Sequence, residues 1–282
     1  MESIVIGVDR TPASTAALAW VAARCARHAA RVRIVNVVGR HGQDQTESMA
    51  LLAEAERQVH ERVPGQPVEL HRAEGSIAQT LATLAEDADL LVIGIDPQHP
   101  IKAALGGWLP VRVASRFTAP VCIVPAGWTE RDGDVVVGVA DDESSIAALD
   151  FAAAEAQSSG ATLRIVHAWR DADVTLDGPE ALLSSAEQMA TEHGQVLDDA
   201  AGRLRRDRPA LSIEPVLIEA TPEAALLGGA EDAALIVIGT HRQGVLQGGL
   251  SGSIAQDILW RTQVPVCVVP HLAPSPADET RP

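Results

Sequence analysis

A glycine-rich segment, GTHRQGVLQGGLSGS at residues 239–253, contains the residue types best suited to holding a chain of phosphates. It follows an apolar run and precedes a helical pattern. Glycines let a backbone approach a ligand closely. Free N–H groups at the start of a helix, together with a hydroxyl, can donate to phosphate oxygens. Gly252 and Ser253 stand where that helix would begin. A loop without a ligand can have the same composition, so the surrounding elements must decide between the two interpretations.

Composition and charge exclude several kinds of partner. The chain has 282 residues, 46% of them hydrophobic, which is enough for two domains that each bury a core. The formal net charge is −16 and Lys102 is the single lysine, so the chain lacks the positive surface that nucleic acids and anionic membranes require. No apolar run approaches the roughly 18 residues that span a bilayer, and MESIVIGVDR does not resemble a signal peptide. We expect a soluble cytoplasmic protein.

The cysteines and histidines do not indicate a redox or metal site. Cys25, Cys122 and Cys267 form no C-x-x-C pair. Cys122 and Cys267 lie within apolar runs, so we interpret these two as small buried hydrophobic residues. His241 has no partner at the spacing of metal ligands. No set of residues resembles a catalytic triad, so we expect neither a metal site nor an enzyme. His167, at the end of a strand, is predicted to pack and hydrogen-bond.

Internal matches in one order indicate that the chain contains two copies of one unit. IVIGV at 4–8 reappears as VVVGV at 135–139, and RIV at 33–35 as RIV at 164–166, both at an offset of 131. DLLVIG at 89–94 reappears as ALIVIG at 234–239, and PVCIVP at 120–125 as PVCVVP at 265–270, both at an offset of 145. The difference, 14 residues, is an insertion between the second and third strands of the second copy. We predict domains at residues 1–128 and 133–271, and a disordered tail at 272–282.

Each copy alternates β-branched runs with helical patterns, which is typical of an α/β fold. In the first copy the predicted strands are 3–8, 32–38, 67–73, 89–95 and 120–125, and the predicted helices are 13–29, 44–62, 76–87 and 108–117. The strands are continuous apolar runs, as expected for parallel strands covered on both faces. We predict two tandem open doubly wound sheets of five parallel strands each. In the second copy, a helix near 179–207 would take up the additional residues.

A ligand of such a sheet should lie beyond the carboxyl ends of the strands. The loops after strand one, GVDRTPAS and GVADDESS, contain no G-x-G-x-x-G, and the chain has no G-x-x-x-x-G-K-[ST], so neither common phosphate-binding fingerprint is present. The loop after strand four of the second copy is the glycine-rich segment.

With the repeat, the position of this loop and the PVCIVP and PVCVVP strands, the chain resembles a tandem universal stress protein over nearly all of both halves. The resemblance implies an adenine-nucleotide-hydrolase-like fold. It also implies a Gly-x2-Gly-x9-Gly-[Ser/Thr] motif for the ATP phosphates and ribose, and an Asp after strand one and a small apolar residue after strand two for the adenosine.

The second copy matches the phosphate end of this motif. Gly239 and Gly252-Ser253 fit it, Arg242 replaces the second glycine, and Ala168 takes the strand-two position. Arg242 could pair with phosphate oxygens or point into solvent. The Asp position falls on Ala140, with Asp141 and Asp142 directly after it.

The first copy matches the adenosine end. Asp9, Val37 and Gly94 fit, whereas Pro97 and Gly107-Trp108 replace the other motif residues. Pro97 lacks a backbone donor and Trp108 replaces a hydroxyl with an indole, so we predict that this copy does not bind ATP. The alternative role for Asp9 is to cap the next turn or helix.

The resemblance therefore implies a cytoplasmic stress-response protein. Its second domain would bind ATP or a related adenine nucleotide, with Mg²⁺, as a regulatory ligand held by Gly239, Arg242, Gly252, Ser253, Ala168 and Asp141. It also implies that PVCIVP and PVCVVP lie edge to edge, and that the tandem chain forms a homodimer. The alternative is a protein that has lost both nucleotide sites and acts through a regulatory protein partner.

Overall fold

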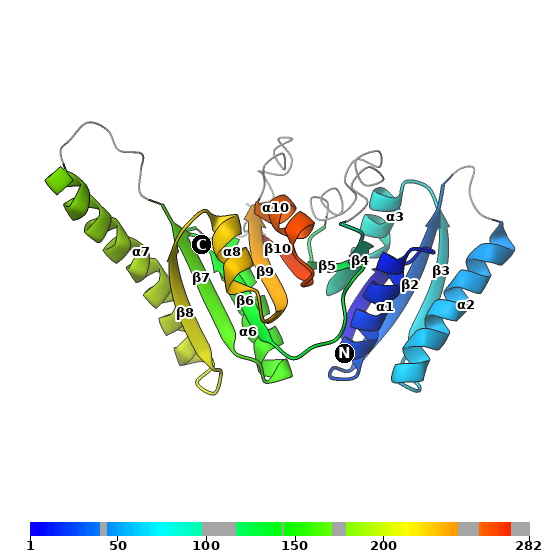
Figure 1. Ribbon diagram of the computed structural model, residues 1–282. Coiled ribbons are helices and arrows are strands. Elements are labelled where there is room, and N and C mark those ends of the chain that lie inside the picture. Colours follow the sequence, from blue (N-terminus) through cyan, green and yellow to red (C-terminus); the bar gives the residue numbers. More distant parts are fainter. Residues whose placement is uncertain (40–43, 98–116, 143, 171–178, 242–253, 272–282) are drawn as a thin grey trace, which may run out of the picture.

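The computed structural model describes residues 1–39, 44–97, 117–142, 144–170, 179–241 and 254–271 (Figure 1). The strands of the first half are β1 (Glu2–Gly7), β2 (Ala30–Val38), β3 (Val68–Glu74), β4 (Leu90–Ile95) and β5 (Val121–Pro125). Those of the second half are β6 (Asp134–Val139), β7 (Leu163–Trp169), β8 (Ile213–Glu219), β9 (Ala233–His241) and β10 (Val266–His271). They form one ten-stranded sheet in the order β3-β2-β1-β4-β5-β10-β9-β6-β7-β8.

Helices cover both faces of this sheet. They are α1 (Pro12–Cys25), α2 (Gln45–Arg62), α3 (Ile77–Leu84), α6 (Ser144–Ser159), α7 (Pro179–Asp207), α8 (Pro222–Gly229) and α10 (Ile254–Arg261). One core lies under α1, α2, α6 and α7, and a second lies under α3, α8 and α10. The predicted doubly wound fold is thus confirmed, including the long helix of the second half. The predicted helix at 108–117 and the tail at 272–282 lie outside the described residues, apart from Phe117.

The two halves join through their last strands, as the resemblance implied. Within each half the strands are parallel, but β10 pairs antiparallel with β5, and Cys267 lies opposite Cys122. A last strand leaves an unpaired edge, and each half covers the edge of the other. The two predicted sheets are therefore one continuous sheet, with a pseudo-two-fold axis at the cysteine pair.

Equivalent contacts recur on both sides of this axis. Arg33 Nη1 donates to the Leu84 carbonyl at 2.6 Å in the first half, and Arg164 Nη1 donates to the Gly229 carbonyl at 2.8 Å in the second. Each of these arginines also pairs with a glutamate of the neighbouring strand. The repeat seen in the sequence is thus also a repeat of the side-chain contacts that hold each helix to its sheet.

The connection between the halves is fixed to both. The Ala126 N–H donates to the Ile95 carbonyl at 2.8 Å, and the Glu130 carboxylate pairs with Arg62 of α2. Arg131 Nη2 donates to the Ala233 carbonyl of the second half at 2.9 Å. The connection therefore extends the contact between the halves beyond the sheet.

Among the helices of the described residues, none is both long enough and apolar enough to cross a membrane.

Candidate functional site

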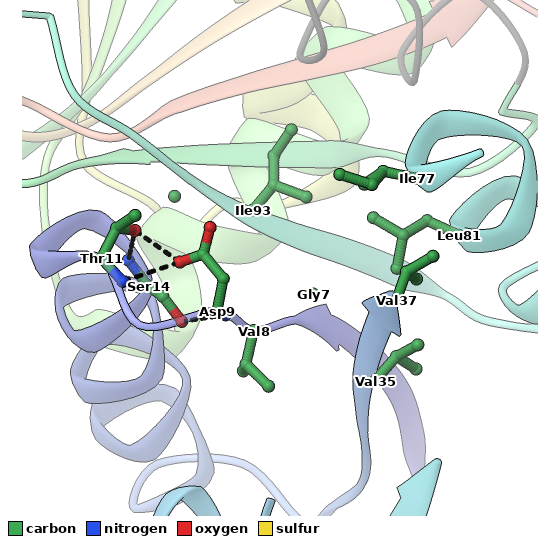
Figure 2. Close-up of a pocket in the computed structure, with 11 residues that line it drawn as sticks. Gly7, Val8, Asp9, Thr11, Ser14, Val35, Val37, Ile77, Leu81 and Ile93 are labelled. Atoms are coloured by element: carbon green, nitrogen blue, oxygen red, sulfur yellow. Dashed lines mark hydrogen bonds between the residues drawn. The ribbon is translucent and has the colours of Figure 1, made fainter. Parts of the chain in front are cut away.

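The first half has a pocket of about 80 Å³ beyond the carboxyl ends of β1, β2 and β4 (Figure 2). It is lined by Gly7, Val8, Asp9, Thr11, Ser14, Val35, Val37, Ile77, Leu81, Ile93 and Gly94. The fold therefore brings together Asp9 and Val37, the two residues predicted for the adenosine end of the first copy. The wall of the pocket is apolar and its polar groups come from the turn between β1 and α1.

One oxygen of Asp9 is engaged within that turn. Asp9 Oδ1 accepts hydrogen bonds from the Thr11 N–H at 2.9 Å and from the Thr11 hydroxyl, and the Asp9 N–H donates to Ser14 Oγ at 3.0 Å. The predicted turn-capping role of Asp9 is thus confirmed. The second carboxylate oxygen points away from Thr11 in Figure 2.

Two equivalent glycines, Gly94 of β4 and Gly239 of β9, have a packing role. A Cβ added to Gly94 would lie 2.3 Å from the Ala13 carbonyl oxygen, and one added to Gly239 would lie 2.3 Å from the Ser144 carbonyl oxygen. Both distances are far below van der Waals contact, so only glycine lets the start of α1 or α6 lie this close to the strand. The sequence motif did not reveal this role, which exists whether or not a ligand binds at Gly239.

The turn after β6 lacks the carboxylate of the turn after β1. At the Asp9 position stands Ala140, whose N–H donates to Ser145 Oγ at 2.8 Å. Asp142 Oδ1 accepts from the Ser144 N–H at 2.9 Å and so caps α6. Asp141 is exposed between them, and Ala168 is partly buried near the end of β7.

Several predicted residues lie outside the described residues. These are Arg242, Gly252 and Ser253 of the second half, and Gly107 and Trp108 of the first. Pro97 lies in a turn directly after β4, and α10 begins at Ile254, the residue that follows Ser253 in the chain.

Buried His167 and partly buried His193 form a polar pair beside the second-half site, and of the two only His167 was predicted. His167 is 4% exposed, its Nδ1 lies 2.8 Å from the Val139 carbonyl oxygen, and its Nε2 lies 2.8 Å from Nδ1 of His193 on α7. A carbonyl only accepts, so His167 donates through Nδ1 and, when neutral, accepts from His193 through Nε2. The predicted hydrogen-bonding role of His167 is thus confirmed.

The first half has a different pair in the same place. Asn36 Nδ2 donates to the Val8 carbonyl at 2.9 Å, and Asn36 Oδ1 accepts from Ser48 Oγ of α2 at 2.6 Å. His167 follows Asn36 at the offset of 131, whereas His193 follows Ser48 at the offset of 145. The 14 additional residues of the second half therefore lie between these two histidines. Comparing the two offsets could have identified His193.

The thiols are buried and the described side chains form no metal cluster. Cys25, Cys122 and Cys267 are free and buried, which confirms the interpretation of Cys122 and Cys267 as core residues. Burial raises the pKa of the Cys25 thiol to about 11 and raises the pKa of Cys267 well above its ordinary value. Both are therefore protonated at neutral pH and are poor nucleophiles. No three His, Cys, Asp or Glu side chains within the described residues gather closely enough to hold a metal ion.

Known proteins with this arrangement are found by sequence and by fold. The chain is 26% identical to universal stress protein Rv1996 of Mycobacterium tuberculosis over an alignment that covers 94% of each chain. It is 25% identical to a universal stress protein of Mycolicibacterium smegmatis over 94% of this chain and 96% of the other. The crystal structure of a universal stress protein from Archaeoglobus fulgidus shares the fold, with a TM-score of 0.70, 17% identity and 96% of each chain covered.

The model of the universal stress protein family matches twice, at residues 1–125 and at residues 133–270. These two matches correspond to the two halves of the ten-stranded sheet, and the relatives have a similar length. The chain belongs to the universal stress protein family.

Proposed function

We propose that the chain is a cytoplasmic stress-response protein that binds ATP or a related adenine nucleotide, as a regulatory ligand, at the carboxyl edge of its second half. The observation that carries this proposal is the register of three adjacent strands. Val139 of β6 lies beside His167 of β7, and Gly138 lies beside Ile238 of β9. The residues that follow, Ala140, Ala168 and Gly239, therefore meet at one edge of the sheet.

The charge of the backbone supports an anionic ligand at this edge. The first turn of α6 begins at Ser144, against Gly239, and α10 begins directly after Gly252-Ser253. Helix N-termini carry a partial positive charge and free N–H groups. They could balance phosphates in a chain whose net charge is −16.

The proposed contacts divide the nucleotide between two parts of the site. Gly252, Ser253 and Arg242 would hold the phosphates. Ala168 and Asp141 would lie near the adenosine, because they follow the core of β7 and of β6. Mg²⁺ would be bound together with the phosphates. The proposed role is binding without turnover.

Assembly into a homodimer and contact with a regulatory protein complete the proposal. Two whole chains would have to dimerise through a surface other than the last strands, because β5 and β10 already pair with each other within one chain.

Thermal unfolding with and without millimolar Mg·ATP tests nucleotide binding. A ligand at about 100 times its dissociation constant adds about 2.7 kcal/mol to the free energy of unfolding, so we expect the midpoint to rise by roughly 5–10 °C. Gly252→Val should abolish the shift, because a branched side chain blocks the approach of the backbone to the phosphates. Gly107→Val, the equivalent change in the first half, is the matched control and should leave the shift intact.

The opposite pattern locates the ligand elsewhere. A shift lost in Gly107→Val and kept in Gly252→Val would move the nucleotide to the first half, beside the Asp9 pocket. If all three folded proteins show no shift, nucleotide binding is wrong, and the alternative of a protein acting through protein contacts alone takes its place.

A further inference from the structure

The contact between the halves pairs equivalent positions of the two copies. The register is symmetric about the cysteine pair, since Val266 lies opposite Ile123 and Val268 lies opposite Val121. Residues on the pseudo-two-fold axis therefore meet their own counterparts. Cys122 meets Cys267, which is the same residue type at the offset of 145.

A second pair on the axis consists of unlike residues. Arg24 of α1 and Glu155 of α6 are equivalent at the offset of 131. Arg24 Nη2 donates to Glu155 Oε1 at 2.7 Å, and Nη1 donates to Glu155 Oε2, so the pair is bidentate. The side chains are 5% and 11% exposed. The guanidinium also bonds Glu2 at 2.8 Å and lies over the Trp20 ring.

Burial alone would lower the pKa of Arg24, but the hydrogen bonds and charges of Glu155 and Glu2 outweigh burial and raise it. The arginine is therefore charged at every pH at which the fold exists. The two carboxylates bind different sides of the guanidinium: Glu2 of the same half accepts from Nε and Nη2, whereas Glu155 of the other half accepts from Nη1 and Nη2.

Pairing of like halves would place like charges on the axis. Two first halves would bring two buried Arg24 guanidinium groups together, and two second halves would bring two Glu155 carboxylates together. Buried like charges at contact distance are strongly unfavourable. The apolar edges β5 and β10 would accept either partner, since the residues that pair are Val-Cys-Ile in β5 and Val-Cys-Val in β10.

We propose that the Arg24–Glu155 pair determines which half of the molecule pairs with which: the surface formed by β5 and α1 accepts an unlike half that carries a carboxylate on α6, and rejects a second copy of itself. The strand edges supply most of the contact, and the ion pair supplies the choice of partner. The determinant is the sign of the charge at position 155 relative to position 24.

Charge reversal in the full chain tests this proposal. Arg24→Glu and Glu155→Arg each put like charges on the axis, and each should lower the thermal midpoint by about 10 °C. The reciprocal variant R24E/E155R keeps the net charge of the cluster with Glu2, so it should recover at least half of the loss. Glu155→Gln keeps an acceptor and removes the charge, so a loss of about half that size is expected.

Arg203→Glu is the matched control. Arg203 of α7 pairs with Asp150, which lies on α6 as Glu155 does. This pair lies within the second half, and its side chains are 32% and 53% exposed. Its reversal should shift the midpoint by no more than about 2 °C.

The proposal is overturned if the losses of the two single reversals simply add in R24E/E155R, because the halves would then not sense the sign of the charge. It is also overturned if the single reversals shift the midpoint no more than the control does. Should a single reversal fail to fold, R24E/E155R and Glu155→Gln still decide, since each is compared directly with the unmodified chain.

Discussion

The first half links β1, β2 and α2 through an amide and a hydroxyl, whereas the second half links the equivalent elements through two imidazoles. The contacts on either side of these pairs are the same in both halves, from the glycine under the helix start to the arginine on the next helix end. The contacts that hold the helices to the sheet are thus the same in both halves, whereas the polar groups at the carboxyl edge differ. This edge is where the two halves can differ in ligand.

We expect the greatest loss of stability from changes to the two equivalent glycines, Gly94 and Gly239. Gly239→Ala and Gly94→Ala each place a Cβ 2.3 Å from a backbone oxygen, so each should lower the free energy of unfolding by about 3 kcal/mol or more. Urea denaturation measures this loss. Gly194→Ala, in α7 with no atom within 4 Å of the added Cβ, is the control and should be neutral or stabilising. Equal losses of stability in both halves would show that the two glycines have the same packing role. A neutral Gly239→Ala would show that they do not.

The imidazole pair should behave as one unit. His193→Ala leaves a buried nitrogen of His167 without its partner and should cost about 1–3 kcal/mol. The double variant H167N/H193S installs the pair of the first half and should lose less than the single variant, because both partners are again matched. Urea denaturation of the two variants gives the answer. A double variant that loses more than the single one would show that the surroundings of the pair, and not only the pair, differ between the halves.

Adding the missing carboxylate to the second half should raise its affinity for the nucleotide. If the second half binds a nucleotide, Ala140→Asp adds an acceptor at the position of Asp9, and affinity should rise about tenfold, as one charged hydrogen bond allows. Titration calorimetry with ATP measures the change. Asp9→Ala in the first half should leave that affinity unchanged. A drop in affinity in this variant would mean that the nucleotide binds in the first half and that our proposal is wrong.

A weaker effect is the pH dependence that Asp87 of the first half contributes to stability. The hydrogen bond from Arg33 lowers the pKa of Asp87 below its ordinary value. A lowered folded-state pKa stabilises the protein above the unfolded pKa, about 3.9, and that contribution is lost as pH falls through the folded value. Asp87→Asn should therefore lower the thermal midpoint by about 1–3 °C near pH 6, and the difference from the unmodified chain should vanish once the pH falls below the lowered pKa of the folded state. A difference that persists at low pH would mean that the carboxylate charge is not its cause.

Periodicity and repeats sufficed for the order of strands and helices within each half. Continuous apolar strands and regularly spaced helical patterns gave the order of elements, and the two offsets gave the insertion and the equivalence of the halves. The pairing of PVCIVP with PVCVVP came from the family resemblance. A sequence alone does not state that ten strands share one sheet, because edge pairing depends on surfaces that are complete only after each half has folded.

The site was less accessible to sequence reasoning. Gly239 carried a ligand interpretation because its motif is known for ligands, whereas its contact with the Ser144 carbonyl depends on a helix that starts 95 residues earlier. His193 was missed because the 14 additional residues separate it from His167, so that it matches the first half at the offset of 145 and not at 131. The Arg24–Glu155 contact was missed because two equivalent positions meet only across the axis.

The antiparallel pairing of β5 and β10 also fixes the molecularity of assembly. Two separate chains that met through these edges would dissociate on dilution, and their stability would depend on concentration. Here both edges belong to one chain, so closing the sheet is a first-order process with a high effective concentration. A cell that makes only a few copies of this protein would still hold every one of them in the paired form.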